Sequence, residues 1–477
     1  MTAPRRVAPF WLALFSVALL VGLIAYNVWV LKSESNHIPL VLATAVIAAI
    51  AVVFLKQTWK EIEDGMLRAI QSAMTPILIL VAIGMVIATW MQSGVVPMLV
   101  VYSLKMISPS VFLVTAFLVC CVVSLATGSS WLTAGTVGIA LIAAGGTLGL
   151  NTAMVAGAIV SGSYFGDKMS PLSDTTNLAP AMAGSTLVEH IRHMVWTVTP
   201  AMVLALIGYV ILGSIGEAHA GSLENVQGVI TVLESQFHLG PWLLIPPVVT
   251  LGLVMYRFPA VPALVLGSLL AFVIGILGHA PNGVAKEVGS YLNGMLEGYQ
   301  SATGDANVDK LLSRGGINSM MTTVALVFCA MCFGGTLVAT GMLRALTDAM
   351  LRLVKGVGSL IATTLATCFG VNVLTSDQYM SIVVPGQMFK EAYLQRRLHP
   401  KNLSRALEDC GTMTSPLIPW NTCGVQMALV LGVGAGLYWK FAFLNLLCPI
   451  VSLIYGYIGF TIVKISDAEA EERLKTA

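Results

Sequence analysis

The chain has 477 residues, of which 57% are hydrophobic and only 10% are charged. Soluble domains carry about 25% charged residues, so this composition excludes a soluble enzyme or binding domain and indicates a polytopic membrane protein. The net charge of +2 is spread over the whole chain, and without a concentrated basic stripe it gives no indication of nucleic-acid binding.

The first predicted membrane helix begins shortly after Arg5 and Arg6 and covers residues 10 to 31. This apolar run is long enough to span a bilayer, whereas the apolar part of a signal peptide is shorter. Because cytoplasmic segments carry the excess of Lys and Arg, the N-terminus is expected in the cytoplasm. A second run at 38 to 55 returns the chain there, so residues 1–59 are predicted to form two N-terminal transmembrane helices.

An internal duplication follows these two helices. Residues 65 to 73 and 294 to 302 are identical at six of nine positions, at an offset of 229. Three further pairs keep the same order at offsets of 245 to 248: Ser93-Gly94 with Thr340-Gly341, Thr127 with Thr375, and Ser170-Pro171-Leu172 with Ser415-Pro416-Leu417. We therefore predict two repeats, at 60–215 and 288–464, with an external loop and connecting helices at 216–287 and a cytoplasmic tail at 465–477.

The basic residues give the two repeats opposite orientations. In the first repeat, residues 111 to 147 fit two ordinary spans or a re-entrant hairpin whose ends are external. In the second, residues 359 to 394 form a hairpin between two basic clusters, so its ends are cytoplasmic. The sequence predicts an all-α polytopic membrane protein, an inverted-repeat secondary transporter with ten full spans, two re-entrant hairpins and two broken helices.

Four polar interruptions lie within apolar segments: the hairpin tips at 127 to 130 and 375 to 378, and the helix breaks at 166 to 177 and 412 to 422. Each intramembrane charge costs about 2.5 to 3.5 kcal/mol on insertion scales, so these positions need a functional reason. Broken helices expose carbonyl groups and helix ends near the midplane, where a dehydrated alkali cation or an anionic group can bind.

Asp167 and Asp174 are the leading candidates for a carboxylate that binds a cation, here sodium, or a proton. Because a bound cation and a proton compete for one carboxylate, such a site can couple the two fluxes. Two structural alternatives remain: an ion pair of Asp167 with Lys168 or with a residue of another helix, and a helix cap formed by Asp174.

The remaining candidates lie in the same four interruptions. Asp377 is expected to be a second ligand or proton carrier, or else a cap, and Asp409 parallels Asp167 with Glu408 beside it on a solvated face. Further cation ligands are predicted among the hydroxyl groups of the tips: Thr127, Ser129, Ser130, Thr375 and Ser376. Substrate contacts are predicted in the two breaks: Ser173, Thr176, Asn177, Trp420, Asn421 and Thr422.

The string from Gly166 to Ala179, GDKMSPLSDTTNLA, resembles the signature of the NhaC family of sodium/proton antiporters. The resemblance extends through Gly128-Ser129-Ser130-Trp131 and from Pro416 to Asn421-Thr422. It implies a transporter of the bacterial inner membrane with two hairpins and two broken helices around the substrate, a homodimeric state and an elevator-like movement. The distribution of Lys and Arg predicts that both termini are cytoplasmic.

Relatives in this family include sodium/proton antiporters, malate/lactate exchangers and amino-acid carriers, so two functions stay open. The first is sodium/proton antiport. The second is sodium- or proton-coupled transport of a small organic acid or amino acid. Sodium, protons and membrane lipid are the expected partners, and no cofactor is expected beyond sodium as the coupling ion. A membrane enzyme or receptor is disfavoured, because no nucleophile motif or metal-ligand cluster appears.

Overall fold

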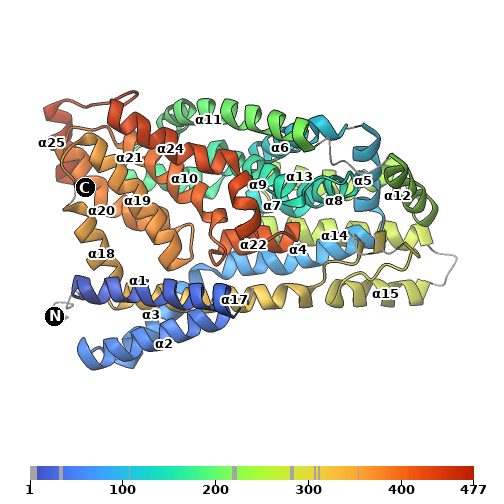
Figure 1. Cartoon of the computed structure of the whole chain (residues 1–477), viewed down its shortest axis with the longest axis horizontal. Helices are drawn as coiled ribbons and strands as arrows, with labels where there is room; N and C mark the ends of the chain where they lie inside the picture. Colours follow the sequence, from blue (N-terminus) through green and yellow to red (C-terminus); the bar gives the residue numbers. More distant parts are fainter. Residues whose placement is uncertain are drawn as a thin grey trace.

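The computed structural model describes residues 8–31, 36–106, 108–216, 223–279, 284–305, 308–309, 312–352 and 354–476. Arg5 and Arg6, which carry the predicted orientation of the N-terminus, and Ala477 of the predicted tail lie outside the described residues. Within these ranges every regular element is a helix, apart from an isolated bridge between Leu398 and Lys464. The start of α1 and helix α25, which are the first and last described helices, lie at the same end of the elongated molecule (Figure 1).

The first half of the chain contains two N-terminal helices and then the helices of the first predicted repeat. The N-terminal segment comprises α1 (Phe10–Ala25), η1 (Tyr26–Val30) and α2 (His37–Phe54). The repeat comprises α3 (Trp59–Ser72), α4 (Met74–Gln92), α5 (Val95–Met106), α6 (Pro109–Thr127), α7 (Ser130–Thr133), η2 (Ala134–Gly138), α8 (Ile139–Thr147), α9 (Thr152–Met169), α10 (Asp174–Ala183) and α11 (Leu187–Gly216).

The second half repeats this order after three connecting helices, α12 (Leu223–Gln236), α13 (Ile245–Met255) and α14 (Ala260–His279). It comprises α15 (Val284–Glu297), α17 (Ile317–Ala339), α18 (Met342–Leu351), α19 (Val357–Thr375), α20 (Met380–Gln395), α21 (Pro400–Leu407), η6 (Glu408–Thr412), η7 (Ser415–Leu417), α22 (Thr422–Leu431), α23 (Ala435–Tyr438), η8 (Trp439–Phe441), α24 (Phe443–Ile458) and α25 (Asp467–Thr476).

Corresponding helices of the two halves lie at opposite ends of the molecule (Figure 1). Helix α3 and the α19–α20 hairpin lie toward the end that carries the chain termini, whereas α15 and the α6–α8 hairpin lie toward the other end. This is the predicted inverted arrangement, with one hairpin and one broken helix in each half. The residue boundaries of the two repeats remain predictions.

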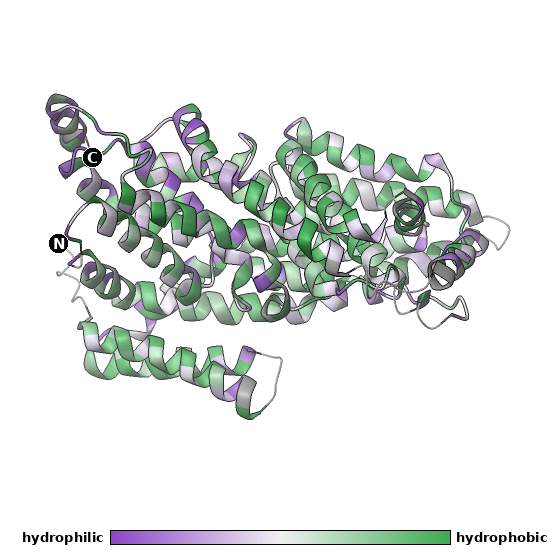
Figure 2. Cartoon of the chain, turned by 45° about the horizontal axis from the view of Figure 1, so that its top comes forward, coloured by the Kyte–Doolittle hydropathy of each residue, from purple (hydrophilic) through white to green (hydrophobic). Residues whose placement is uncertain are grey.

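Most residues of the helices are hydrophobic, and hydrophilic residues gather at the ends of the molecule and at a few interior positions (Figure 2). Among the described residues, eight helices are long and apolar enough to cross a membrane, or up to ten if two sharply bent helix pairs count as one span each. Both arms of the first hairpin, α6 and the run Ser130–Thr147, reach this length. The prediction of a multi-span membrane protein is confirmed.

The two halves exchange their amphipathic helices: α3 packs on α17 of the second half, and α15 packs on α4 of the first. Gly65 of the first duplicated sequence makes this close contact possible, because a methyl group there would lie 2.5 Å from the Ala339 side chain and 2.9 Å from the Gly335 carbonyl oxygen. A methyl group on Gly294 would meet the end of the flexible Gln92 side chain at 2.8 Å. In the first half, the duplicated motif therefore serves helix packing.

Each hairpin tip contacts the break of the broken helix in its own half. Gly128 adopts φ +70 at the first tip, and a methyl group there would lie 2.6 Å from the Leu172 backbone. At the second tip, the Thr422 amide donates a 2.9 Å hydrogen bond to the Ser376 carbonyl. These contacts bring all four predicted polar interruptions into the interior of the helical assembly.

Candidate functional site

The first broken helix leaves its helical path later than the sequence indicated. Helix α9 continues through Asp167 and Lys168 to Met169, and the break covers only 170 to 173. The cause is Pro171, because the residue before a proline is pushed into an extended conformation, and Ser170 has φ −77 and ψ 129. Both charged residues therefore belong to the last turn of α9.

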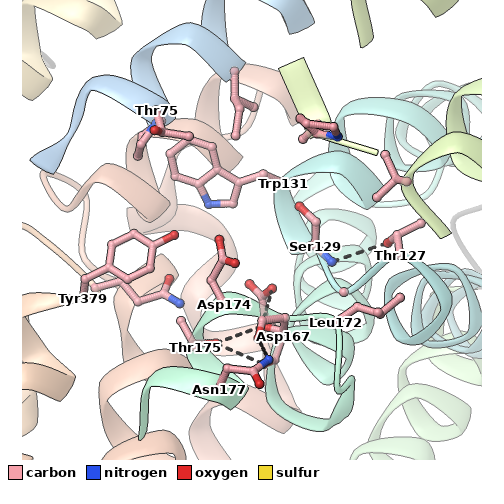
Figure 3. A pocket seen from close by; sticks show the side chains of 18 of the residues that line it. Thr75, Thr127, Ser129, Trp131, Asp167, Leu172, Asp174, Thr175, Asn177 and Tyr379 are labelled. Carbon is pink, nitrogen blue, oxygen red and sulfur yellow. Dashed lines mark hydrogen bonds between the residues drawn. The ribbon is translucent and has the colours of Figure 1, made fainter. Parts of the chain in front are cut away.

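Asp167 connects the first hairpin tip to both parts of the broken helix (Figure 3). Its carboxylate accepts a 3.2 Å hydrogen bond from the Ser130 amide, a hydrogen bond from the Ser130 hydroxyl, and a 3.5 Å bond from the Ser173 hydroxyl. Its backbone carbonyl accepts hydrogen bonds from the Thr175 hydroxyl at 3.0 Å and the Thr176 hydroxyl at 2.5 Å. Asp167 is nearly buried, and the donors that surround its carboxylate suit an ionised group.

Asp174 is the first helical residue of α10, and Ser173 occupies the N-cap position before it. Its side chain is exposed and points into the cavity, toward the space between Trp131 and Tyr379 (Figure 3). The positive end of the α10 dipole lies behind it and favours negative charge at this position. Asp167 and Asp174 thus approach one cavity from the two sides of the break.

That cavity has a volume of about 720 Å³, within the range of small-molecule sites. Residues from both hairpin tips, from both broken helices, from α4 and from the α13–α14 connection surround it. Its polar and aromatic lining residues are Thr75, Thr127, Ser129, Trp131, Asp167, Ser173, Asp174, Thr175, Asn177, Arg257, Phe258, Gln378, Tyr379 and Thr422. It has room for a hydrated cation or a small organic ion.

No group of three or more His, Cys, Asp or Glu side chains that could hold a metal occurs among the described residues. A sodium ion would therefore need hydroxyl and carbonyl oxygens beside the carboxylates, which are ligands that hard cations accept. Of the predicted tip hydroxyls, those of Thr127 and Ser129 line the cavity. Each already has a local role, since Thr127 donates to the Val123 carbonyl at 2.9 Å and Ser129 caps α7 through the Leu132 amide at 3.2 Å.

Three predicted substrate residues of the first break hold the break together. Asn177 donates hydrogen bonds to the carbonyls of Pro171 at 2.9 Å and Ser173 at 2.7 Å. Ser173 and Asn177 also line the cavity, whereas the buried Thr176 hydroxyl faces the Asp167 carbonyl. The break is thus a closed polar loop that presents Ser173, Asp174 and Asn177 to the cavity.

The predicted residues of the second tip lie apart from the first carboxylate pair. Asp377 and Thr375 line a separate cavity of about 150 Å³ together with Arg68 of α3. The Asp377 carboxylate accepts a 2.8 Å hydrogen bond from the Met380 amide at the start of α20, which is the arrangement of a cap. Ser376 occupies the left-handed region at φ 58 and places its carbonyl against α22.

The predicted substrate residues of the second break have different surroundings. The Trp420 indole donates to the Val373 carbonyl at 2.8 Å, and Asn421 caps α22 by accepting from the Cys423 amide at 3.0 Å. Only Thr422 of the three lines the main cavity. Trp420 and Asn421 of the second break therefore hold the backbone in place, and Thr422 is the predicted residue of this break that lines the cavity.

Lys168 forms a fully buried ion pair with Asp409 of the other broken helix, not with its neighbour Asp167. The Thr197 hydroxyl also donates to Asp409 at 2.9 Å, and the Arg405 guanidinium lies 3.9 Å from it. The sequence left open an ion pair between Asp167 and another helix, and the residue of α9 that forms an interhelical ion pair is Lys168. The expectation of a solvated Glu408 is wrong, because the residue is completely buried.

Several cavity residues were missed by the sequence analysis. Trp131 follows the first polar tip directly, and Gln378 and Tyr379 belong to or follow the second, so widening the tips by a few residues would have found them. Arg257 lies in the α13–α14 connection, far along the chain from all four interruptions, and no local pattern marks it.

Comparison with known proteins gives the same assignment as the resemblance in the first broken helix. Residues 162–460 match the Na⁺/H⁺ antiporter family. The chain is 39% identical to the Na⁺/H⁺ antiporter NhaC of Alkalihalophilus pseudofirmus, over 96% of this chain and 98% of that protein. It is 37% identical to the NhaC antiporter of Bacillus subtilis over 88% and 92% of the two chains.

A relative with a different named substrate is also similar. The malate-2H⁺/Na⁺-lactate antiporter of Bacillus subtilis is 33% identical, over 87% of each chain. All three relatives are named as antiporters and none as an enzyme. The match to the family covers well over half of the chain, and the chain therefore belongs to the Na⁺/H⁺ antiporter family.

Proposed function

We propose that this protein exchanges sodium ions for protons across the inner membrane of a bacterium, with Asp167 and Asp174 as the carboxylates for which the two ions compete. The observation that carries the proposal is the convergence of a nearly buried carboxylate and an exposed one on the same cavity, at the break of a membrane helix. The named activity of the NhaC relatives supports sodium and protons as the cargo.

The arrangement provides for competition between the two ions. A sodium ion in the cavity would be attracted by both carboxylates and could complete its coordination with hydroxyl oxygens such as those of Ser173 and Thr422, which line the same space. A proton on Asp167 would remove the charge that holds the cation, and the cation would in turn disfavour that proton. Alternate binding of the two ions at one site is sufficient for antiport.

The orientation follows from the positive-inside rule. Lys56, Lys60 and Arg68 lie in or beside α3, which is found at the end of the molecule that carries the termini (Figure 1). We assign this end to the cytoplasm. A homodimer is proposed on the resemblance to the family alone.

A second candidate function is exchange of a small organic anion. The specific observation is Arg257, an exposed guanidinium that lines a cavity much larger than a bare sodium ion, together with the malate/lactate relative. A panel of labelled organic and amino acids in proteoliposomes tests it, with Arg257→Gln as the matched variant. Uptake of an organic acid that depends on Arg257 would favour this function, and absence of uptake for the whole panel would remove it.

Sodium/proton antiport is tested in everted membrane vesicles that contain the protein. Addition of sodium is expected to dissipate an imposed pH gradient, and Asp167→Asn and Asp174→Asn are each expected to abolish the response. Glu391→Gln makes the same chemical change on the exposed face of α20 and should respond like the wild type. A wild-type protein without a sodium response at any pH between 6 and 9 would refute the proposal.

A further inference from the structure

Glu408 is a carboxylate that the proposed mechanism does not use. It is fully buried as the first residue of the π-helical turn η6, and neither of its carboxylate oxygens has a hydrogen-bond partner among the described residues. An ionised carboxylate in such surroundings is strongly destabilised unless it is paired. Glu408 therefore needs a proton or a cation to be stable in this position.

A second unpartnered polar group lies at the other end of the same π-helical turn. The Thr412 hydroxyl also lacks a hydrogen-bond partner among the described residues. The π-helical turn itself is a further indication, because single π-turns inside α-helices occur frequently at functional sites. These features are unusual for a carboxylate that only fills space.

The buried charges around the two broken helices do not balance. Three buried carboxylates, Asp167, Glu408 and Asp409, face two buried cations, Lys168 and Arg405. Lys168 pairs with Asp409, and Arg405 lies 3.9 Å from the same carboxylate. With all five groups ionised, one negative charge is left over. A proton on Glu408, the carboxylate without hydrogen bonds, would remove it.

A series of hydroxyl groups leads from the neighbourhood of Glu408 to the cavity. The hydroxyls of Thr175 and Thr412 are its polar neighbours. The Thr175 hydroxyl lies 3.1 Å from that of Ser173, which in turn donates to Asp167 at 3.5 Å. Ser173 and Thr175 both line the cavity. Hydroxyl groups can accept and donate a proton at once, so this series offers a route for a proton between the cavity and Glu408.

Other ionisable groups surround the η6 turn on the elements that pack against it. They are Asp167 and Lys168 of α9, Asp174 of α10, Cys368 of α19, Tyr393 of α20, Arg405 of α21, Asp409 and Cys410 of η6 itself, and Cys448 of α24. Of these, Lys168 and Asp167 act on Glu408 electrostatically. A sodium ion bound in the cavity would add a positive charge beside this group and disfavour a proton on Glu408.

We propose that Glu408 is a second proton-binding site, which releases its proton into the cavity through Thr175 and Ser173 when sodium binds at Asp167 and Asp174. In this step the O–H bond of the Glu408 carboxyl breaks, each hydroxyl accepts one proton and passes on another, and the proton leaves into cavity water. The hydroxyls are unchanged and Glu408 becomes a carboxylate. This inference rests on the proposed sodium/proton antiport and adds one proton to each sodium ion exchanged.

The test counts protons released when sodium chloride is added to purified protein in weakly buffered detergent solution with a pH indicator. Glu408→Gln is expected to release one proton fewer per bound sodium than the wild type, while proteoliposomes keep sodium/sodium exchange within about twofold. Glu391→Gln should match the wild type in both measurements. An unchanged proton count in Glu408→Gln, or loss of its sodium/sodium exchange, would overturn the inference.

A second variant covers the case in which Glu408→Gln does not fold. Thr175→Val removes the hydroxyl beside Glu408 but keeps the carboxyl, so stopped-flow measurement should show the same number of released protons at a rate at least tenfold lower. A wild-type rate would exclude this route. Failure of the antiport proposal looks different, because the wild type itself would then release no protons on addition of sodium.

Discussion

The buried ion pair of Lys168 and Asp409 connects the two broken helices. The loss of unfolding free energy on removing one partner can be worked out from its surroundings. Both side chains are fully buried. Loss of one partner from a buried ion pair costs about 3 to 5 kcal/mol, because it leaves an uncompensated charge. In Lys168→Met, Asp409 would keep the Thr197 hydroxyl at 2.9 Å and Arg405 at 3.9 Å. We therefore expect the lower end, a loss of about 3 kcal/mol in the free energy of unfolding.

The reverse change, Asp409→Asn, leaves Lys168 without its partner and should cost a similar amount. The double variant Lys168→Met/Asp409→Asn contains neither uncompensated charge. We expect it to lose no more stability than either single variant, which corresponds to a coupling energy of about 3 kcal/mol, the upper end for residues in contact.

Denaturant titration of the purified variants in mixed detergent micelles measures these values. Lys105→Met is the matched control, because Lys105 pairs with Glu234 at 2.6 Å while both side chains are about half exposed, and such pairs contribute only about 0 to 1 kcal/mol. A loss in Lys168→Met no greater than in the control, or additive losses in the double variant, would refute the reasoning.

Three further predictions concern other parts of the molecule. Gly128→Ala should cost about 1 to 2 kcal/mol for the left-handed backbone alone and separate the first tip from the break, so vesicles should lose the sodium response; a wild-type response would contradict this. Ser130→Ala removes a charge-assisted hydrogen bond to Asp167 worth about 1.5 to 3 kcal/mol. A sodium titration should therefore show that the apparent affinity for sodium falls by about tenfold or more, and an unchanged affinity would contradict the role of Ser130. Hydrogen bonds from the Thr303 amide and hydroxyl hold the pKa of Asp309 below its ordinary value. This stabilisation is present above the ordinary pKa and is lost as the pH falls through the lowered pKa, so hydrogen exchange of the Thr303 amide should lose its protection in that range. Asp309→Asn should lack this protection already at neutral pH, and wild-type protection that does not depend on pH would argue against the prediction.

The sequence was sufficient for the arrangement of helices, hairpins and breaks because each feature has a local cause. Polar residues within apolar runs mark the tips and breaks, and the duplicated order with opposite charge asymmetry predicts the inversion. The start of the first break was predicted about one helical turn too early, at residue 166, whereas α9 continues to Met169. Only the proline rule, applied more strictly, would have corrected this.

Contacts between distant segments could not be predicted in the same way. Lys168 and Asp409 are 241 positions apart, and their pairing depends on how the two broken helices cross. Asp377 and Ser376 are adjacent, yet Asp377 faces the small cavity beside α3, whereas the Ser376 carbonyl contacts α22. The backbone conformation of the tip determines these different directions. Burial of Glu408 likewise results from packing against α9, α10, α19, α20 and α24, and the local sequence pattern does not indicate it.

The exchange of α3 and α15 between the halves has a consequence for synthesis in the cell. Helix α3 ends at Ser72, and its packing partner α17 begins only at Ile317, 245 positions later. At roughly 5 to 20 residues per second, the ribosome needs on the order of 12 to 50 s to make the intervening chain. During that time α2 contacts part of the apolar face of α3, and the rest of that face can lie on the membrane surface, for which its amphipathic sequence is suited. Neither half can complete its fold before the other is made, so the two repeats mature as one unit.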